Sequence, residues 1–129
     1  MIVVDTSVWI RALRSASCSE AIALRSLLDA DEVALPVPAR SELLMGARAA
    51  DRAKLERQLK GVPLLYPTDA SWRTIDDWTR TASSAGSTFA IADLLIGVLT
   101  AEIGGLVWSA DGDFERMETL GLVQRFDLT

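Results

Sequence analysis

The chain has 129 residues, of which 50% are hydrophobic and 24% are charged, and its formal net charge is −5. This length suffices for a single domain with a substantial hydrophobic core, so folding requires neither disulfides nor a structural metal. Because the chain has one cysteine, Cys18, and no histidine, its composition excludes an internal disulfide, Ser-His-Asp and Cys-His catalysis, and zinc sites built from Cys or His.

Strands and helices alternate along the predicted chain. Ile2 to Val4 is short, β-branched and apolar, as expected for a strand that is covered on both faces, and Thr6 or Ser7 can cap the helix that follows. The next predicted segments are a helix over 19–29, a strand over 33–35, helices over 38–50 and 52–59, and a weak strand at 64–65.

The second half continues this alternation. The predicted segments are, in order, a helix from Asp69 or Ser71 to about Gly86, a very apolar helix over 89–103 capped by Thr88, a strand over 106–108, a helix over 113–120 and a last strand over 122–126. We therefore predict an α/β fold: one domain over residues 1–129, with a short central parallel sheet of four to five strands flanked by helices on both faces. In such sheets, functional residues lie beyond the carboxyl ends of the strands.

Carboxylates follow two of the predicted strands and lie near the start of two predicted helices. Asp5 comes directly after the first strand and Asp111 follows the strand over 106–108, while Glu42 and Asp93 lie early in their helices. A parallel sheet can bring all four to one edge. Four like charges so close repel strongly. Mg²⁺ or Mn²⁺, which prefer oxygen ligands, would relieve the repulsion and activate a water for attack on a phosphodiester.

Each carboxylate also has a purely structural explanation. Asp5 can cap a helix, Glu42 can be a surface charge favoured by the helix dipole, and the DGD sequence at 111–113 can be a polar turn or a cap. A salt bridge to an arginine would explain Asp93, although its surroundings, FAIADLLIGVLTA, are apolar on nearly every side. A calcium loop of the EF-hand type is excluded, since the rest of its spacing and its closing glutamate are missing.

Charge is distributed unevenly along the chain. Residues 38–60 carry six basic and three acidic side chains, whereas residues 101–129 carry six acidic and two basic ones. A basic segment beside an acid-rich one suits an anionic substrate that is held next to cations, although the negative net charge alone argues against a nucleic-acid partner. The sequence predicts neither a signal peptide nor a membrane span, so we expect a cytoplasmic protein.

Four short segments in this order, VVDTSVWI, SELLMG, IADLLIG and WSADGDFERMETLGL, resemble the PIN-domain ribonucleases. More narrowly, they resemble the VapC-type toxins of bacterial and archaeal toxin–antitoxin pairs, and the likeness covers essentially the whole chain. The resemblance implies an endoribonuclease that depends on Mg²⁺ or Mn²⁺. It places Asp5, Glu42, Asp93 and Asp111 at the family's acidic positions, with Asp113 as a further ligand that can replace or assist Asp111.

The resemblance also implies roles for residues around the acids. Thr6 and Ser109 stand where the family often has a hydroxyl that hydrogen-bonds a carboxylate or a metal-bound water, although Thr is more usual than Ser at the second position. Family members usually form homodimers, are neutralised by a VapB-type antitoxin and cut structured RNA such as tRNA or ribosomal RNA. Arg40 and Arg11 are then expected to hold substrate phosphates near the metals.

Other functions fit the sequence less well. A receiver domain needs a lysine late in the chain, but the only lysines are Lys54 and Lys60, and a phosphatase of the haloacid-dehalogenase type needs an aspartate where Ser7 stands. The remaining alternative is a catalytically silent PIN-like module that binds RNA or protein. The presence of all four acids disfavours this alternative.

Overall fold

The computed structural model describes residues 1–128, and at its centre is a parallel sheet. Its strands are β1 (Ile2–Val4), β2 (Val33–Pro36), β3 (Leu64–Leu65) and β4 (Leu106–Trp108), in the order β3-β2-β1-β4. β1 pairs with β2 on one side and β4 on the other, and all three of its residues are buried. A strand covered on both faces reads as an apolar run without alternation, which is why the sequence predicted it correctly.

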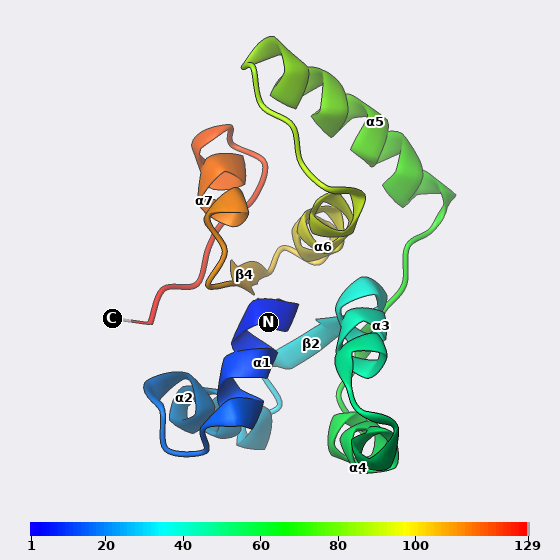
Figure 1. The fold of residues 1–129 in the computed structure, drawn as a ribbon. Helices are drawn as coiled ribbons and strands as arrows, with labels where there is room; N and C mark the ends of the chain where they lie inside the picture. Colours follow the sequence, from blue (N-terminus) through cyan, green and yellow to red (C-terminus); the bar gives the residue numbers. More distant parts are fainter. Residues whose placement is uncertain (129) are drawn as a thin grey trace.

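Within the described residues, helices surround this sheet (Figure 1). They are α1 (Thr6–Arg14), α2 (Ser19–Asp29), α3 (Val37–Gly46), α4 (Ala49–Leu59), α5 (Asp69–Ser84), α6 (Ile91–Glu102) and α7 (Gly112–Thr119). The chain runs outward from β1 through β2 to β3 and then returns to β4 on the other side of β1. The predicted α/β class is confirmed, and the strand order reverses between β1 and β4, where the carboxyl ends of an open sheet form a crevice.

Three predicted helix boundaries and one predicted strand were wrong. The predicted helix over 38–50 ends at Gly46, since Ala47 and Arg48 are extended, and the next helix starts at Ala49 instead of 52. Helix α6 begins at Ile91, with the extended Ala90 before it, so Thr88 does not cap it. The predicted strand over 122–126 is reduced to a single bridge between Arg125 and Val107, which leaves four strands in the described residues.

The core is built where α6 packs over the sheet. Ile96 and Val98 of α6 are fully buried together with Phe114 of α7, which explains why the sequence of α6 is the most apolar of the helices. Trp9 and Trp78 are buried in this core, whereas Trp72 is 46% exposed. No helix within residues 1–128 is long and apolar enough to cross a membrane.

Candidate active site

Asp5 lies at the switch point between β1 and β4. Its backbone N–H donates to the carbonyl of Trp108 at 2.9 Å, which ties together the carboxyl ends of the two strands. The residue is only 5% exposed. Although Asp5 occupies the N-cap position of α1, its side chain makes no capping hydrogen bond. The carboxylate is therefore available for a role other than capping.

Two serine hydroxyls fix the Asp5 carboxylate. Ser7 Oγ and Ser109 Oγ both donate to Asp5 Oδ2, at 2.8 and 2.7 Å, while Ser7 Oγ accepts from the N–H of Ala110 at 3.0 Å. Each hydroxyl has one proton, so the 3.2 Å contact between the two serines adds no third hydrogen bond when both protons point to Asp5. Within residues 1–128, Asp5 Oδ1 makes no hydrogen bond and is not sealed from solvent. This oxygen is free to bind a ligand.

Ser7 was missed as a site residue by the sequence reasoning, which treated it only as a helix cap. The structure places it in the first turn of α1, where its hydroxyl points back to the carboxylate two residues earlier. The signal was present in the sequence, because the side chains of Ser, Thr, Asn and Asp often form local hydrogen bonds at helix starts. Ser109, which the resemblance singled out, completes the same arrangement from β4's side.

Glu42 projects from α3 and is held by Thr6. Thr6 Oγ1 donates to Glu42 Oε1 at 3.3 Å, so the hydroxyl of the buried Thr6 contacts a carboxylate. Much of the Glu42 side chain is exposed, yet burial of its carboxylate and the charge of Asp5 raise the pKa of Glu42, which the hydrogen bond from Thr6 partly offsets. The carboxylates of Asp5 and Glu42 therefore interact electrostatically.

Three further carboxylates gather where α6 and α7 begin. Oxygens of Asp93, Asp111 and Asp113 lie within 4.8 Å of one another. Burial, a hydrogen bond shared with Asp113 and the charges of Asp5, Asp113 and Asp111 raise the pKa of Asp93 to about 7. Asp111 also caps α7, since its Oδ1 accepts from the N–H of Asp113 at 3.1 Å. Asp111 therefore both caps α7 and belongs to the carboxylate cluster.

Arg116 is the cation nearest this cluster. Its guanidinium donates to Asp113 Oδ1 at 2.5 Å, lies 4.6 Å from the centre of the Phe89 ring and donates to the carbonyl of Thr88 at 3.4 Å. The hydrogen bond from Arg116 lowers the pKa of Asp113. No ion pair within residues 1–128 involves Asp93, so the arginine bridge considered for Asp93 is found at Asp113 instead.

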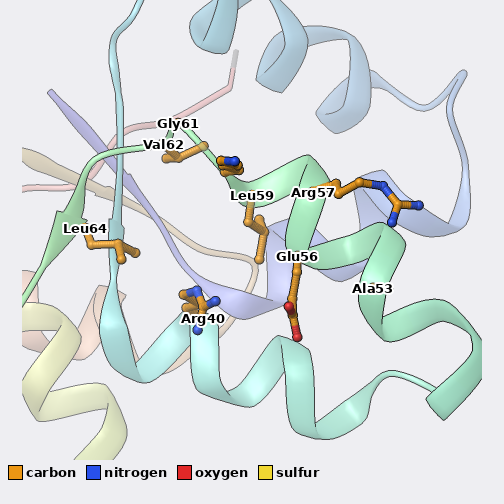
Figure 2. Close-up of a pocket in the computed structure, with 9 residues that line it drawn as sticks. Arg40, Ala53, Glu56, Arg57, Leu59, Gly61, Val62 and Leu64 are labelled. Atoms are coloured by element: carbon orange, nitrogen blue, oxygen red, sulfur yellow. The ribbon is translucent and has the colours of Figure 1, made fainter.

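The two arginines expected to hold phosphates lie in different places. Arg11 pairs with Glu20 at 3.2 Å and lines a small cavity that Ser109 also lines. Arg40 lines a separate cavity formed with α4 (Figure 2). The two positions 40 and 42 are about 200° apart around α3, which places Arg40 on a different side of the helix from Glu42.

The cluster of Asp93, Asp111 and Asp113 fits a divalent cation. Its donors are all carboxylate oxygens, the type that hard cations such as Mg²⁺ and Mn²⁺ prefer. The pKa of Asp93, about 7, means that burial and the neighbouring carboxylates disfavour its ionised form. A cation would relieve this repulsion.

Comparison with known proteins identifies the family. The sequence model of the PIN domain matches residues 2–120. The chain belongs to the PIN domain family. The VapC ribonuclease Mb1587 of Mycobacterium bovis is 34% identical to it over 120 residues, which cover 89% of this chain and 90% of the relative. These matches confirm the resemblance to VapC-type PIN domains and, with it, the nuclease class of enzyme.

Solved structures confirm the fold of this PIN domain. VapBC2 from Rickettsia felis, bound to a DNA fragment from its promoter, matches with a TM-score of 0.81 and 15% identity over 100% of both chains. VapBC-5 from Mycobacterium tuberculosis, a member of the VapBC family of toxin–antitoxin systems, matches with a TM-score of 0.72 and 23% identity over 98% of this chain and 97% of that one. At these identities the likeness shows the fold alone.

Proposed function

We propose that this PIN domain, over residues 1–129, is a toxin that cuts structured RNA such as tRNA or ribosomal RNA with Mg²⁺ or Mn²⁺. The observation that carries the proposal is the set of carboxylates at the switch point of the sheet: Asp5 and Glu42 beside the cluster of Asp93, Asp111 and Asp113. The chain has no histidine, so acid–base chemistry falls to these carboxylates. The name of the M. bovis relative, VapC ribonuclease, supports RNA as the substrate.

Each carboxylate has its own proposed role in hydrolysis. Asp93, Asp111 and Asp113 would hold the ion, and Asp5 would contribute Oδ1, since the two serines occupy Oδ2. A bound divalent ion supplies a Lewis acid that activates water and neutralises charge at the phosphate. The water oxygen forms a bond to phosphorus as the bond from phosphorus to the ribose 3′ oxygen breaks, which yields a 5′-phosphate and a 3′-hydroxyl. Glu42, whose pKa is raised, takes the water's proton, and the leaving 3′ oxygen takes a proton from solvent water.

The same proposal includes the partners of the protein. We expect a VapB-type antitoxin to neutralise it, as the VapBC structures that share its fold suggest. We also expect a homodimer, which the 46% exposure of Trp72 on α5 and the 82% exposure of Met45 on α3 support. The proposed location is the cytoplasm, where tRNA and ribosomes are found.

The experiment is a transcriptome-wide map of new RNA 5′ ends after induction of the wild type or of Asp93→Asn in a bacterial host. The map presupposes no substrate. Discrete 5′-phosphate ends with the wild type alone would support a site-specific endoribonuclease and name its target. Identical maps from two soluble, folded proteins would contradict the proposal and favour the binding-only module.

A further inference from the structure

A cavity of about 530 Å³ lies between the first turns of α3, the end of α4 and the segment that enters β3 (Figure 2). Three of its lining side chains are cationic, Arg40, Arg57 and Lys60, and one is anionic, Glu56. The other lining residues are small or apolar: Ala53, Leu59, Gly61, Val62 and Leu64. The cavity is therefore a concave site with positive charge and no acidic cluster.

The three cations of this basic cavity have no partner within residues 1–128. Five ion pairs occur in that part of the chain, and none of them involves Arg40, Arg57 or Lys60. Their side chains also make none of the hydrogen bonds found there, whereas Arg11, Arg48 and Arg125 are each paired with a carboxylate. Cations without an ionic partner at a concave surface attract an anion.

The basic cavity differs from three other cavities in the charge of its lining residues. The basic cavity has three cationic and one anionic lining residue. The cavity between α1 and α4 has three cationic and two anionic ones, and in two smaller cavities the opposite charges balance. Of these four cavities, the basic cavity has the largest excess of positive lining charge, which favours an anionic polymer there.

We propose that the basic cavity binds a phosphodiester of the RNA substrate outside the position that is cut. This inference rests on the proposed function for the identity of the polymer, and it adds a second contact to that polymer's backbone. Because Arg40 and Glu42 lie about 200° apart around α3, a strand that is cut at the acids reaches the cavity by crossing this helix. Arginine and lysine contacts to phosphate give affinity without reading the base sequence.

The test measures binding of a fluorescein-labelled oligouridine by anisotropy, over a series of KCl concentrations at a fixed Mg²⁺ concentration. All proteins carry Asp5→Asn, which prevents cleavage. The cavity variant Arg57→Gln/Lys60→Gln is compared with Arg25→Gln/Arg80→Gln, which removes two exposed cations from α2 and α5. We expect the cavity variant alone to bind about tenfold more weakly and to lower the slope of log Kd against log salt by about 1.4, which is about 0.7 for each of two contacts to a single strand.

Arg40→Ala provides a second test of the same cavity, with an expected loss of slope of about 0.7 for one contact to a single strand. Unchanged affinity and slope in the cavity variants would overturn the inference, as would an equal loss in the control. A fall in melting temperature with unchanged RNA binding would also overturn it, because the cations would then act only on the carboxyl end of α4. Failure of the proposed function is separate: the wild type would then leave RNA uncut in Mg²⁺, whatever the cavity variants bind.

Discussion

Asp93 and Asp113 are neighbouring carboxylates whose pKa values shift in opposite directions. Burial and the surrounding negative charges raise the pKa of Asp93 to about 7, whereas the hydrogen bond from Arg116 lowers that of Asp113. Near neutral pH the two carboxylates therefore share a proton in the metal-free protein, and their titration belongs to the pair. A divalent cation takes the place of that proton, so metal affinity should rise as the pH rises through 7.

Asp93→Asn should stabilise the metal-free protein at alkaline pH. In the unfolded chain Asp93 titrates near its ordinary pKa of 3.8, but in the native protein it does so at about 7. Between these values the native state binds more protons, so the free energy of unfolding falls as pH rises. In EDTA at pH 8 we expect the variant to melt about 3–6 °C above the wild type, the shift that about 1 kcal/mol produces.

Circular dichroism melts at several pH values check this prediction. The difference between variant and wild type should vanish below the unfolded pKa, where Asp93 is protonated in both states. Asp76→Asn, at an exposed position of α5, serves as the control and should leave the pH dependence unchanged. A constant difference at all pH values would show that Asp93 does not titrate in this range.

The serine pair predicts a second effect at the level of single residues. Ser109→Ala removes one of the two hydroxyls that hold Asp5 Oδ2, and a hydrogen bond to a charged group contributes about 1.5–3 kcal/mol. We expect Ser109→Ala to reduce RNA cleavage at least tenfold, the effect of about 1.4 kcal/mol. Ser109→Thr keeps the hydroxyl and should retain activity. Equal cleavage by the Ala and Thr variants would remove Ser109 from the site.

At the scale of elements, the buried strands were more predictable than the helix ends or the last strand. β1 and β4 are buried apolar runs whose residue types alone indicate a strand. The start of α6 was missed because residues 88–90 are held by contacts from a distant part of the chain. Arg116 of α7 stacks on Phe89 and donates to the carbonyl of Thr88, and no local pattern reveals a contact over 28 positions.

Gly97 sets how closely α6 packs on its neighbours. A Cβ at this position would lie 3.0 Å from the Trp78 ring, 3.1 Å from Met117 Sδ and 3.4 Å from Val123. We expect Gly97→Val to lower the free energy of unfolding by about 2 kcal/mol, the typical effect of overpacking. Urea denaturation measures it. Gly46→Val is the matched control, because a Cβ at Gly46 meets nothing within 4 Å, and an equal loss there would show that backbone effects dominate.

At the scale of the whole molecule, the strand order assembles a site from distant segments. Alternation of strands and helices was enough to predict that Asp5, Glu42, Asp93 and Asp111 approach one edge. The same reasoning grouped Arg40 with the acids without distinguishing the two sides of α3. Helical phase places Arg40 about 200° from Glu42, and the cavity beside Arg40 depends on α4 and β3, whose packing the sequence does not specify.

Repulsion among the assembled acids should make the stability of the whole domain depend on divalent ions. An ion that binds only the folded state at about 100 times its Kd adds about 2.7 kcal/mol to the free energy of unfolding. We therefore expect Mn²⁺ to raise the melting temperature of the wild type by about 8–16 °C, measured against KCl of equal ionic strength. Asp5→Asn/Asp93→Asn should lose this response while melting at or above the temperature of the metal-free wild type. An equal Mn²⁺ response in the double variant would mean that the ion binds elsewhere on this acidic surface.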